Sequence, residues 1–375
     1  MIYLDYYSTS PIEEKVLEAM YPFFKEKFFN PLSKNKIGAS IKEEIEKARS
    51  KVAKLINANK DEIIFTSSGT ESNNSIIKGL TFAYEKRGRH IITSKSEHHS
   101  VLNPMRSLER MGFYVTFLSP NKYGEINPSS VESAIRDDTM FVSIGLASVD
   151  VGTINNIKEI AKILKKRDIL FHTDAVAAVG NMHLDVKDLG VDALSFSSHV
   201  FGGPKGIGGF YLKDGLRFMP LIYGGPQEFG KRAGTENVPG IIGLGVAAEL
   251  ATQDLDKRIQ WRNKAIERIK QIFSIDGIDL VGKDSERLPG HLSFIVDKVQ
   301  STDMISYLES NDIYVSSGSP CVSYALKVSP MLISMGYSFE KASSIITLST
   351  SHRTTENEVD IFLEVFEEAV KKLRH

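Results

Sequence analysis

Cysteine is almost absent from this sequence of 375 residues, which contains Cys321 and no second one. A single thiol excludes an internal disulfide, and it excludes metal or redox sites built from paired cysteines. A chain without disulfides fits a reducing compartment, so we expect a cytoplasmic protein. The opening residues lack a basic segment followed by an apolar run, and we therefore expect no signal peptide.

An excess of charge of either sign is missing as well. Lysine and arginine number 46, and aspartate and glutamate number 47, so no broad basic field exists to hold nucleic acid or an anionic membrane surface. No stretch approaches the ~18 apolar residues that a membrane span needs. We therefore expect neither a nucleic-acid partner nor a membrane.

Apolar, β-rich segments alternate with helical periodicity over about the first 250 residues. This alternation predicts a mainly parallel sheet with helices on both faces. Beyond that point we expect a long polar helix at 255–272 and then mixed short elements, and the chain length also favours two domains. The expected strands are 62–66, 90–93, 113–118, 140–144, 169–172, 193–197 and 208–212, and the clearest helices are 41–56, 131–135 and 157–165.

The segment Ser67–Ser72 follows an expected strand and opens a helical run. Small residues at such a turn let backbone N–H groups and hydroxyls face an anion, and the helix N-terminus adds partial positive charge. An ordinary capping box, serine or threonine followed by glutamate, explains the same residues. The Gly-Lys-Ser/Thr ending of a P-loop is absent.

Other polar segments also stand at strand ends. A histidine of Glu97-His98-His99 could stack on a flat ring, but no third ligand has metal-site spacing, so we expect no metal; a structural histidine is the alternative. Asp174 ends an apolar strand, where a carboxylate could pair with a ring nitrogen or cap a helix. Segment 195–209 is rich in glycine, which allows close backbone approach, and 232–237 offers a further anion-binding turn.

The order of these segments makes nearly the whole chain resemble the cysteine desulfurases that supply sulfur for iron–sulfur clusters, a family of pyridoxal-phosphate (PLP) enzymes. The resemblance implies the fold-type I PLP-transferase architecture, an α/β fold whose large domain has a mainly parallel mixed sheet. It implies a smaller α/β domain from both chain ends and a homodimer with active sites at the subunit interface. We expect the large domain at 14–252 and the small domain at 1–13 and 253–375. The matching segments are Tyr3–Tyr6, Asn30-Pro31, 65–74, Glu97-His98, His172–Ala175, 195–208, 232–237 and Ser316-Ser317-Gly318-Ser319-x-Cys321.

The resemblance also implies roles for individual residues. Cys321 is the expected nucleophile, whose thiolate takes sulfur from a cysteine–cofactor adduct and becomes a persulfide. Thr235 is expected to reach the cofactor phosphate of the other subunit. The remaining expected cofactor-binding residues are Gly69 and Thr70 at the phosphate, His98 stacked on the pyridine ring, Asp174 at the ring nitrogen, and Ser197 and His199 around the phosphate and ring.

Several positions depart from the family pattern, and they serve the reactive side of the ring or the substrate. Val200 stands where the family has the lysine that forms a Schiff base and moves protons, and valine can do neither. His352 replaces the arginine that binds the substrate carboxylate as a fork, with Arg353 one residue out of phase. Ala177 replaces a glutamine, and Ser148–Asp150 replaces Asn-Asn-Glu. We therefore expect PLP to be bound non-covalently or to be absent.

Three functions fit this combination of kept and lost residues. We favour a sulfur-handling protein of iron–sulfur cluster or thio-cofactor assembly, in which Cys321 accepts or passes on sulfur, or contributes a ligand to a cluster on a partner scaffold. The alternatives are a PLP enzyme of altered substrate and a non-catalytic partner subunit of an active desulfurase. Cys321 lies in a Ser/Gly-rich segment of the kind that often carries function. Lys205 belongs to the family's own Gly-Pro-Lys-Gly turn and needs no new role as a Schiff-base former.

Overall fold

The computed structural model describes residues 1–318 and 328–374. Its larger unit is built on a seven-stranded sheet of order β2-β8-β7-β6-β5-β3-β4, in which only β8 runs antiparallel to its neighbours. The α/β fold with a mainly parallel mixed sheet is therefore confirmed. The strands are β2 (Ile63–Thr66), β3 (His90–Ser94), β4 (Tyr114–Leu118), β5 (Thr139–Ser143), β6 (Leu170–Asp174), β7 (Ala193–Ser197) and β8 (Gly208–Leu212).

Apolar side chains on both faces of this sheet explain why helices cover it on both sides. In β2, Ile63 and Phe65 belong to one core cluster, while Ile64 between them belongs to another. This alternation follows from the two-residue period of a strand. The first face is covered by α1 (Glu14–Met20), α3 (Lys36–Leu55), α6 (Pro128–Ala134), α7 (Ile157–Lys165), α8 (Val186–Leu189) and the first half of α9 (Val238–Ile269), and the second by α4 (Gly69–Tyr84) and α5 (His99–Arg110).

The smaller unit joins the two ends of the chain. Ile2 and Leu4 lie in one core cluster with Ile266 of α9 and Phe362 of the C-terminal helix. The N-terminal strand β1 (Ile2–Tyr3) pairs in parallel with β11 (Ile313–Tyr314). The other elements are the antiparallel strands β9 (Ile278–Leu280), β10 (His291–Val296) and β12 (Ile345–Ser349), with helices α10 (Ser301–Glu309), α11 (Pro330–Ser334), α12 (Phe339–Ala342) and α13 (Glu356–Leu373).

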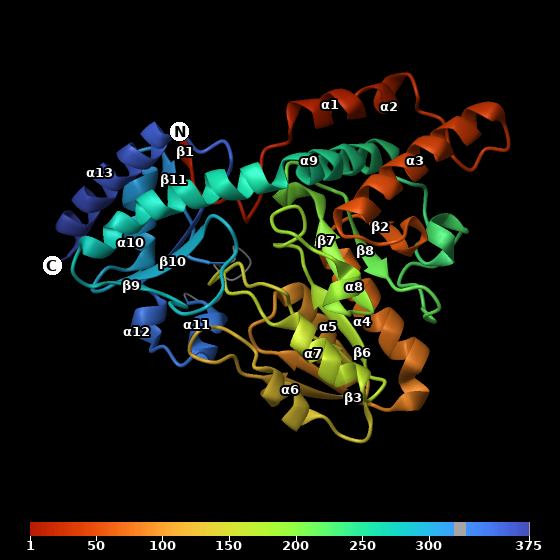
Figure 1. The fold of residues 1–375 in the computed structure, drawn as a ribbon, viewed down its shortest axis with the longest axis horizontal. Helices are drawn as coiled ribbons and strands as arrows, with labels where there is room; N and C mark the ends of the chain where they lie inside the picture. Colours follow the sequence, from red (N-terminus) through yellow and green to blue (C-terminus); the bar gives the residue numbers. More distant parts are fainter. Residues whose placement is uncertain (319–327, 375) are drawn as a thin grey trace.

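Helix α9 runs along both units (Figure 1). The expectation of a helix starting at residue 255 is wrong, because α9 begins at Val238, where the Asn237 side chain accepts a hydrogen bond from the Gly240 N–H. The first half of α9 is apolar and buried, so the polar pattern marked only its second half. A domain boundary after residue 252 falls inside this continuous helix, and the division into 14–252 and 1–13 with 253–375 stays a prediction. No helix of the described residues is long and apolar enough to cross a bilayer.

Candidate functional site

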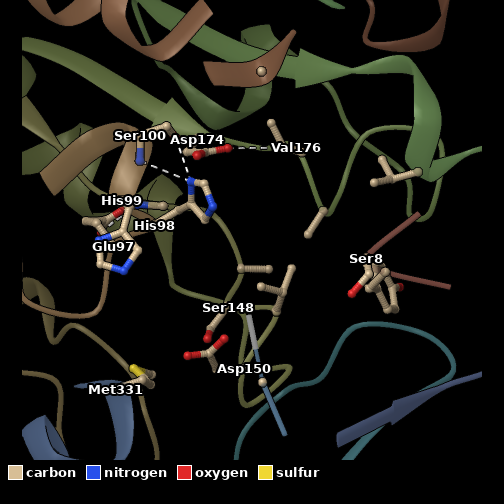
Figure 2. Close-up of a pocket in the computed structure, with 18 of the residues that line it drawn as sticks. Ser8, Glu97, His98, His99, Ser100, Ser148, Asp150, Asp174, Val176 and Met331 are labelled. Atoms are coloured by element: carbon tan, nitrogen blue, oxygen red, sulfur yellow. Dashed lines mark hydrogen bonds between the residues drawn. The ribbon is translucent and has the colours of Figure 1, made fainter. Parts of the chain in front are cut away.

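A cavity of about 320 Å³ lies where the carboxyl ends of the parallel strands face the smaller unit. Parallel strands end at the same edge of a sheet, so the loops that follow β2, β3, β5, β6 and β7 converge there. Figure 2 shows the side chains that converge on it. Six of the sequence-predicted site residues line this cavity, namely Gly69, Thr70, His98, Asp174, Ser197 and His199.

One end of the cavity presents hydrogen-bond donors to an anion. Gly69 and Thr70 form the first turn of α4, where backbone N–H groups have no partner inside the helix. The Ser197 hydroxyl is buried, lines the cavity and has no hydrogen-bond partner among the described residues. A buried hydroxyl left without a partner is costly, so a bound group that accepts its hydrogen bond stabilises the site. A phosphate group fits this arrangement.

The capping interpretation of the same segment is partly correct. Ser68 caps α4, because its Oγ accepts a hydrogen bond from the Glu71 N–H at 3.2 Å. The Glu71 carboxylate does not return to Ser68, as a capping box requires, but accepts from the N–H of Ser67 at 2.8 Å. The carboxylate also holds Arg232, whose Nε lies 2.9 Å from Glu71 Oε1. The cap therefore coexists with free N–H groups at the cavity, and it anchors the loop that carries Thr235.

His98 and Asp174 lie close together at the cavity (Figure 2). His98 caps α5, and its Nδ1 accepts a hydrogen bond from the Ser100 N–H at 3.1 Å. Asp174 ends β6 and does not cap a helix; its Oδ1 accepts from the Val176 N–H at 3.0 Å and its Oδ2 from the Asn73 amide at 2.6 Å. A flat ring with a protonated nitrogen fits between an imidazole and such a carboxylate.

Three further carboxyl groups line the cavity besides Asp174, and the sequence reasoning assigned none of them a role. Glu97 accepts two hydrogen bonds from the Gly145 N–H, each at 3.0 Å. Burial, reinforced by the charge of Asp174, raises the pKa of Glu97 to about 8. Burial also raises the pKa of Asp5. The only signal in the sequence that Glu97 would lie at the cavity was its position beside His98.

Asp150 belongs to a wall segment that the smaller unit holds in place. The Ser293 hydroxyl donates to the Asp150 carbonyl at 2.7 Å, and the Ser329 hydroxyl donates to Asp150 Oδ2 at 2.8 Å. His291 Nε2 lies 2.8 Å from the carbonyl oxygen of Val149, and burial lowers the pKa of His291 to about 3. The ring is therefore neutral and donates from Nε2. The wall of the cavity thus depends on contacts from β10, and its shape is coupled to the smaller unit.

Position 200 offers no covalent anchor for an aldehyde cofactor. Val200 lines the cavity and is 2% exposed. Lys95 is the one lysine among the described lining residues, and its exposed side chain donates to Ser119 Oγ at 3.1 Å. Lys205 is exposed and does not line the cavity. The residues present therefore fit the phosphate and ring of PLP, but they do not fit a Schiff base at position 200.

The side chains of His352 and Arg353, which follow β12, are paired with Glu13. His352 Nε2 lies 3.2 Å from Glu13 Oε1, and Arg353 Nη2 lies 2.5 Å from Glu13 Oε2. Neither residue is among those that line the cavity. These contacts, led by the hydrogen bond from His352, lower the pKa of Glu13 to about 2. A free carboxylate in the cavity therefore meets no arginine of the described lining.

Three predicted residues remain, namely His199, which lines the cavity, and Thr235 and Cys321, which are not among its described lining residues. Burial, followed by the charge of Lys205, lowers the pKa of His199, whose Nδ1 lies 3.3 Å from Thr9 Oγ1. Thr235 is exposed and does not line the cavity of its own chain. Cys321 lies outside the described residues, and Gly318, three positions before it, lines the cavity. Among the described residues, no group of three or more His, Cys, Asp and Glu could hold a metal ion.

Comparisons with known proteins show which family and which solved structures the chain is similar to. The family described as Aminotransferase class-V matches residues 2–362. The cysteine desulfurase IscS of Dictyoglomus turgidum is 45% identical over 377 residues, covering 100% of this chain and 95% of the relative. The cysteine desulfurase IscS of Methanosarcina thermophila is 43% identical over 375 residues, covering 100% and 93%. A solved NifS-like protein superposes with a TM-score of 0.92 at 35% identity, covering 99% of this chain and 100% of that one.

Proposed function

Because the chain belongs to the cysteine desulfurases of the class-V aminotransferase family, we propose that it transfers sulfur for iron–sulfur cluster or thio-cofactor assembly in the cytoplasm. Cys321 is the thiol that carries the sulfur. The observation that carries this proposal is that Ser316 and Gly318, which lead to Cys321, line the same cavity as His98 and Asp174. Cys321 is therefore only three positions along the chain from a residue that lines the cavity in which sulfur would arrive.

The transfer step conserves atoms and electrons without a separate oxidant. The Cys321 thiolate attacks the outer sulfur of a donor persulfide, a new S–S bond forms on Cys321, and the donor's S–S bond breaks. The donor leaves as a thiolate and takes up a proton from solvent. The reverse exchange passes the sulfur to an acceptor thiol on a scaffold protein, which we expect to be the partner in cluster assembly.

The cavity residues support non-covalent binding of PLP. Gly69, Thr70 and Ser197 would hold its phosphate, Asp174 would pair with the ring nitrogen, and His98 would lie against the ring. When bound, PLP would supply an electron sink for an amino-acid substrate. Val200 offers no amine to move a proton, and proton transfer by a side chain is typically worth about 10²–10⁴-fold in rate. We therefore expect turnover of L-cysteine to be weak or absent.

A homodimer is part of the proposal, because several large apolar side chains are exposed on the larger unit. Tyr21, Phe24 and Phe28 are 62%, 64% and 67% exposed, and Tyr223 is 71% exposed. Exposed apolar groups of this size mark interaction surfaces when they gather together. The loop that carries Thr235 is tied to α4 through Arg232, which suits delivery of that hydroxyl to a neighbouring subunit.

The test is transfer of labelled sulfur from a small-molecule persulfide to an iron–sulfur scaffold protein. Wild-type protein and Cys321→Ser are compared, together with Ser317→Ala as a control in the same segment. Loss of transfer in Cys321→Ser alone supports the proposal. Equal transfer by wild type and Cys321→Ser contradicts it. Sulfide release from L-cysteine, measured on the same samples, is expected at least about 10²-fold below that of a desulfurase with the lysine.

A further inference from the structure

Asn73 connects the two groups that face the predicted cofactor ring, although it does not line the cavity itself. It lies on α4, one turn after Gly69, and is fully buried. Its amide nitrogen donates to Asp174 Oδ2 at 2.6 Å and to Ser100 Oγ at 2.8 Å. Both amide hydrogens are therefore used, one toward the carboxylate and one toward the start of α5.

The Asp174 carboxylate determines which way the Asn73 amide is turned, and therefore that Asn73 donates both of its hydrogen bonds. An ionised carboxylate only accepts, so the Asn73 amide must turn its NH₂ toward Asp174 and leave its oxygen on the other side. Consistent with this orientation, the buried Asn73 Oδ1 has no hydrogen-bond partner among the described residues. A buried oxygen without a partner destabilises the fold, so the two donated bonds must outweigh that loss.

Ser100 links the Asn73 amide to the imidazole of His98. Its hydroxyl accepts from Asn73 and therefore directs its own hydrogen toward His98 Nδ1, which lies 2.7 Å from Ser100 Oγ. The Ser100 N–H also donates to Nδ1, at 3.1 Å. A ring nitrogen that receives two donors carries a lone pair, so neutral His98 holds its proton on Nε2. Figure 2 shows His98, Ser100 and Asp174 side by side at the cavity.

We propose that Asn73 is a positioning residue that holds Asp174 and, through Ser100, fixes the tautomer and ring orientation of His98. The ring-nitrogen partner and the ring-facing imidazole thereby form one unit that is organised before any ligand binds. The inference rests on the proposed function for the identity of the ring, but the linkage itself lies within the protein. If Asn73 served only to pack α4 against α5, its removal would not change the tautomer of His98.

The first experiment needs no cofactor. Magic-angle-spinning ¹⁵N spectra of histidine-labelled protein identify the His98 nitrogens by their loss in His98→Gln. We expect wild type to show an unprotonated, hydrogen-bonded Nδ1 and a protonated Nε2. Asn73→Ala and Ser100→Ala should move the Nδ1 resonance, while Asn74→Ala, which removes a neighbouring amide bonded to the Thr70 carbonyl, should not. Identical His98 resonances in all variants would overturn the proposal.

The second experiment measures PLP affinity by absorbance titration of the same variants. Asn73→Ala is expected to bind PLP about tenfold more weakly than wild type, because Asp174 and His98 lose their fixed orientation. Ser100→Thr, which keeps the hydroxyl, should bind more tightly than Ser100→Ala, and Asn74→Ala should match wild type. Equal affinity of Asn73→Ala and Asn74→Ala overturns the proposal. Should wild type bind no PLP, the cofactor assignment fails, and the ¹⁵N spectra alone decide the role of Asn73.

Discussion

The carboxylate of Glu13 lies 3.2 Å from the imidazole of His352, Oε1 to Nε2, and joins residues that are far apart in the sequence. Arg353 and Arg258 approach the same carboxylate, at 2.5 Å and 3.6 Å. His352, which stands at the position of the family's substrate arginine, and the adjacent Arg353 are therefore both paired with an internal acid.

The contribution of Glu13 to stability should depend on pH. The pKa of Glu13 is about 2 in the folded protein against 4.5 in the unfolded chain, so its stabilisation is complete above pH 4.5 and is lost as pH falls toward 2. We expect Glu13→Gln to lower the free energy of unfolding at pH 7 by about 1–3 kcal/mol, and by less at pH 3. Urea unfolding at both pH values measures this difference. The exposed neighbour Glu14 provides the control, Glu14→Gln; equal effects of the two substitutions would contradict the assignment.

The contribution of Glu97 to stability should depend on pH in the opposite direction to that of Glu13. Its pKa is about 8 in the folded protein and 4.5 in the unfolded chain, so the stability it contributes is fully present below pH 4.5 and declines as pH rises to 8. Glu97→Gln should therefore be more stable than wild type at pH 9, by on the order of 1–3 kcal/mol, with the advantage shrinking toward pH 5. Urea unfolding across this range, with the exposed Glu132→Gln as control, checks it. A pH-independent difference would show that Glu97 is not the titrating group.

Ser197 should distinguish PLP from pyridoxal, which lacks the phosphate. Its buried hydroxyl lines the anion end of the cavity, and deleting a hydrogen bond to a charged group weakens binding by about tenfold. Ser197→Ala should lose affinity for PLP and keep its affinity for pyridoxal in equilibrium titrations. Ser198→Ala is the matched control, because the Ser198 hydroxyl is also buried without a partner among the described residues but does not line the cavity. Equal losses in both variants would count against a phosphate site here.

Val200→Lys should create a covalent attachment for PLP. Position 200 faces the cavity, and a lysine there can reach an aldehyde bound beside Asp174. After borohydride reduction, peptide mass spectrometry should find the cofactor on Lys at position 200 in the variant and on no lysine in wild type. Val149→Lys, on another wall of the same cavity, serves as control and should gain little or no label. Labelling of Lys95 or Lys205 in wild type would show that another amine replaces the missing one.

The sequence predicted the sheet, some of its helices, and six candidate residues that the structure brings to the cavity. The sheet could be predicted because strands and turns are local patterns, and the six residues lie together because the topology of a parallel sheet brings strand ends to one edge. The start of α9 escaped prediction, since its first half is buried and apolar and lacks the polar face of its second half.

Contacts between residues that are far apart in the sequence could not be predicted either. Nothing local in the sequence indicates that Glu13 would meet His352, or that Asn73 would meet both Ser100 and Asp174. Such contacts depend on how α1, α4, α5, β6 and the segment after β12 pack in three dimensions. The roles assigned to Thr235 and Cys321 likewise stay predictions, the first because it concerns a second subunit and the second because it lies outside the described residues.

The most direct test of the central claim is intact-protein mass spectrometry after incubation with either L-cysteine or a small-molecule persulfide. The account predicts that wild type gains one sulfur atom from the persulfide, that Cys321→Ser gains none, and that L-cysteine adds little or no sulfur to either protein. A wild type that takes no sulfur from the persulfide would contradict the role of Cys321. Rapid sulfur loading from L-cysteine would contradict the expectation that turnover of L-cysteine is weak or absent with Val200 in place of the lysine.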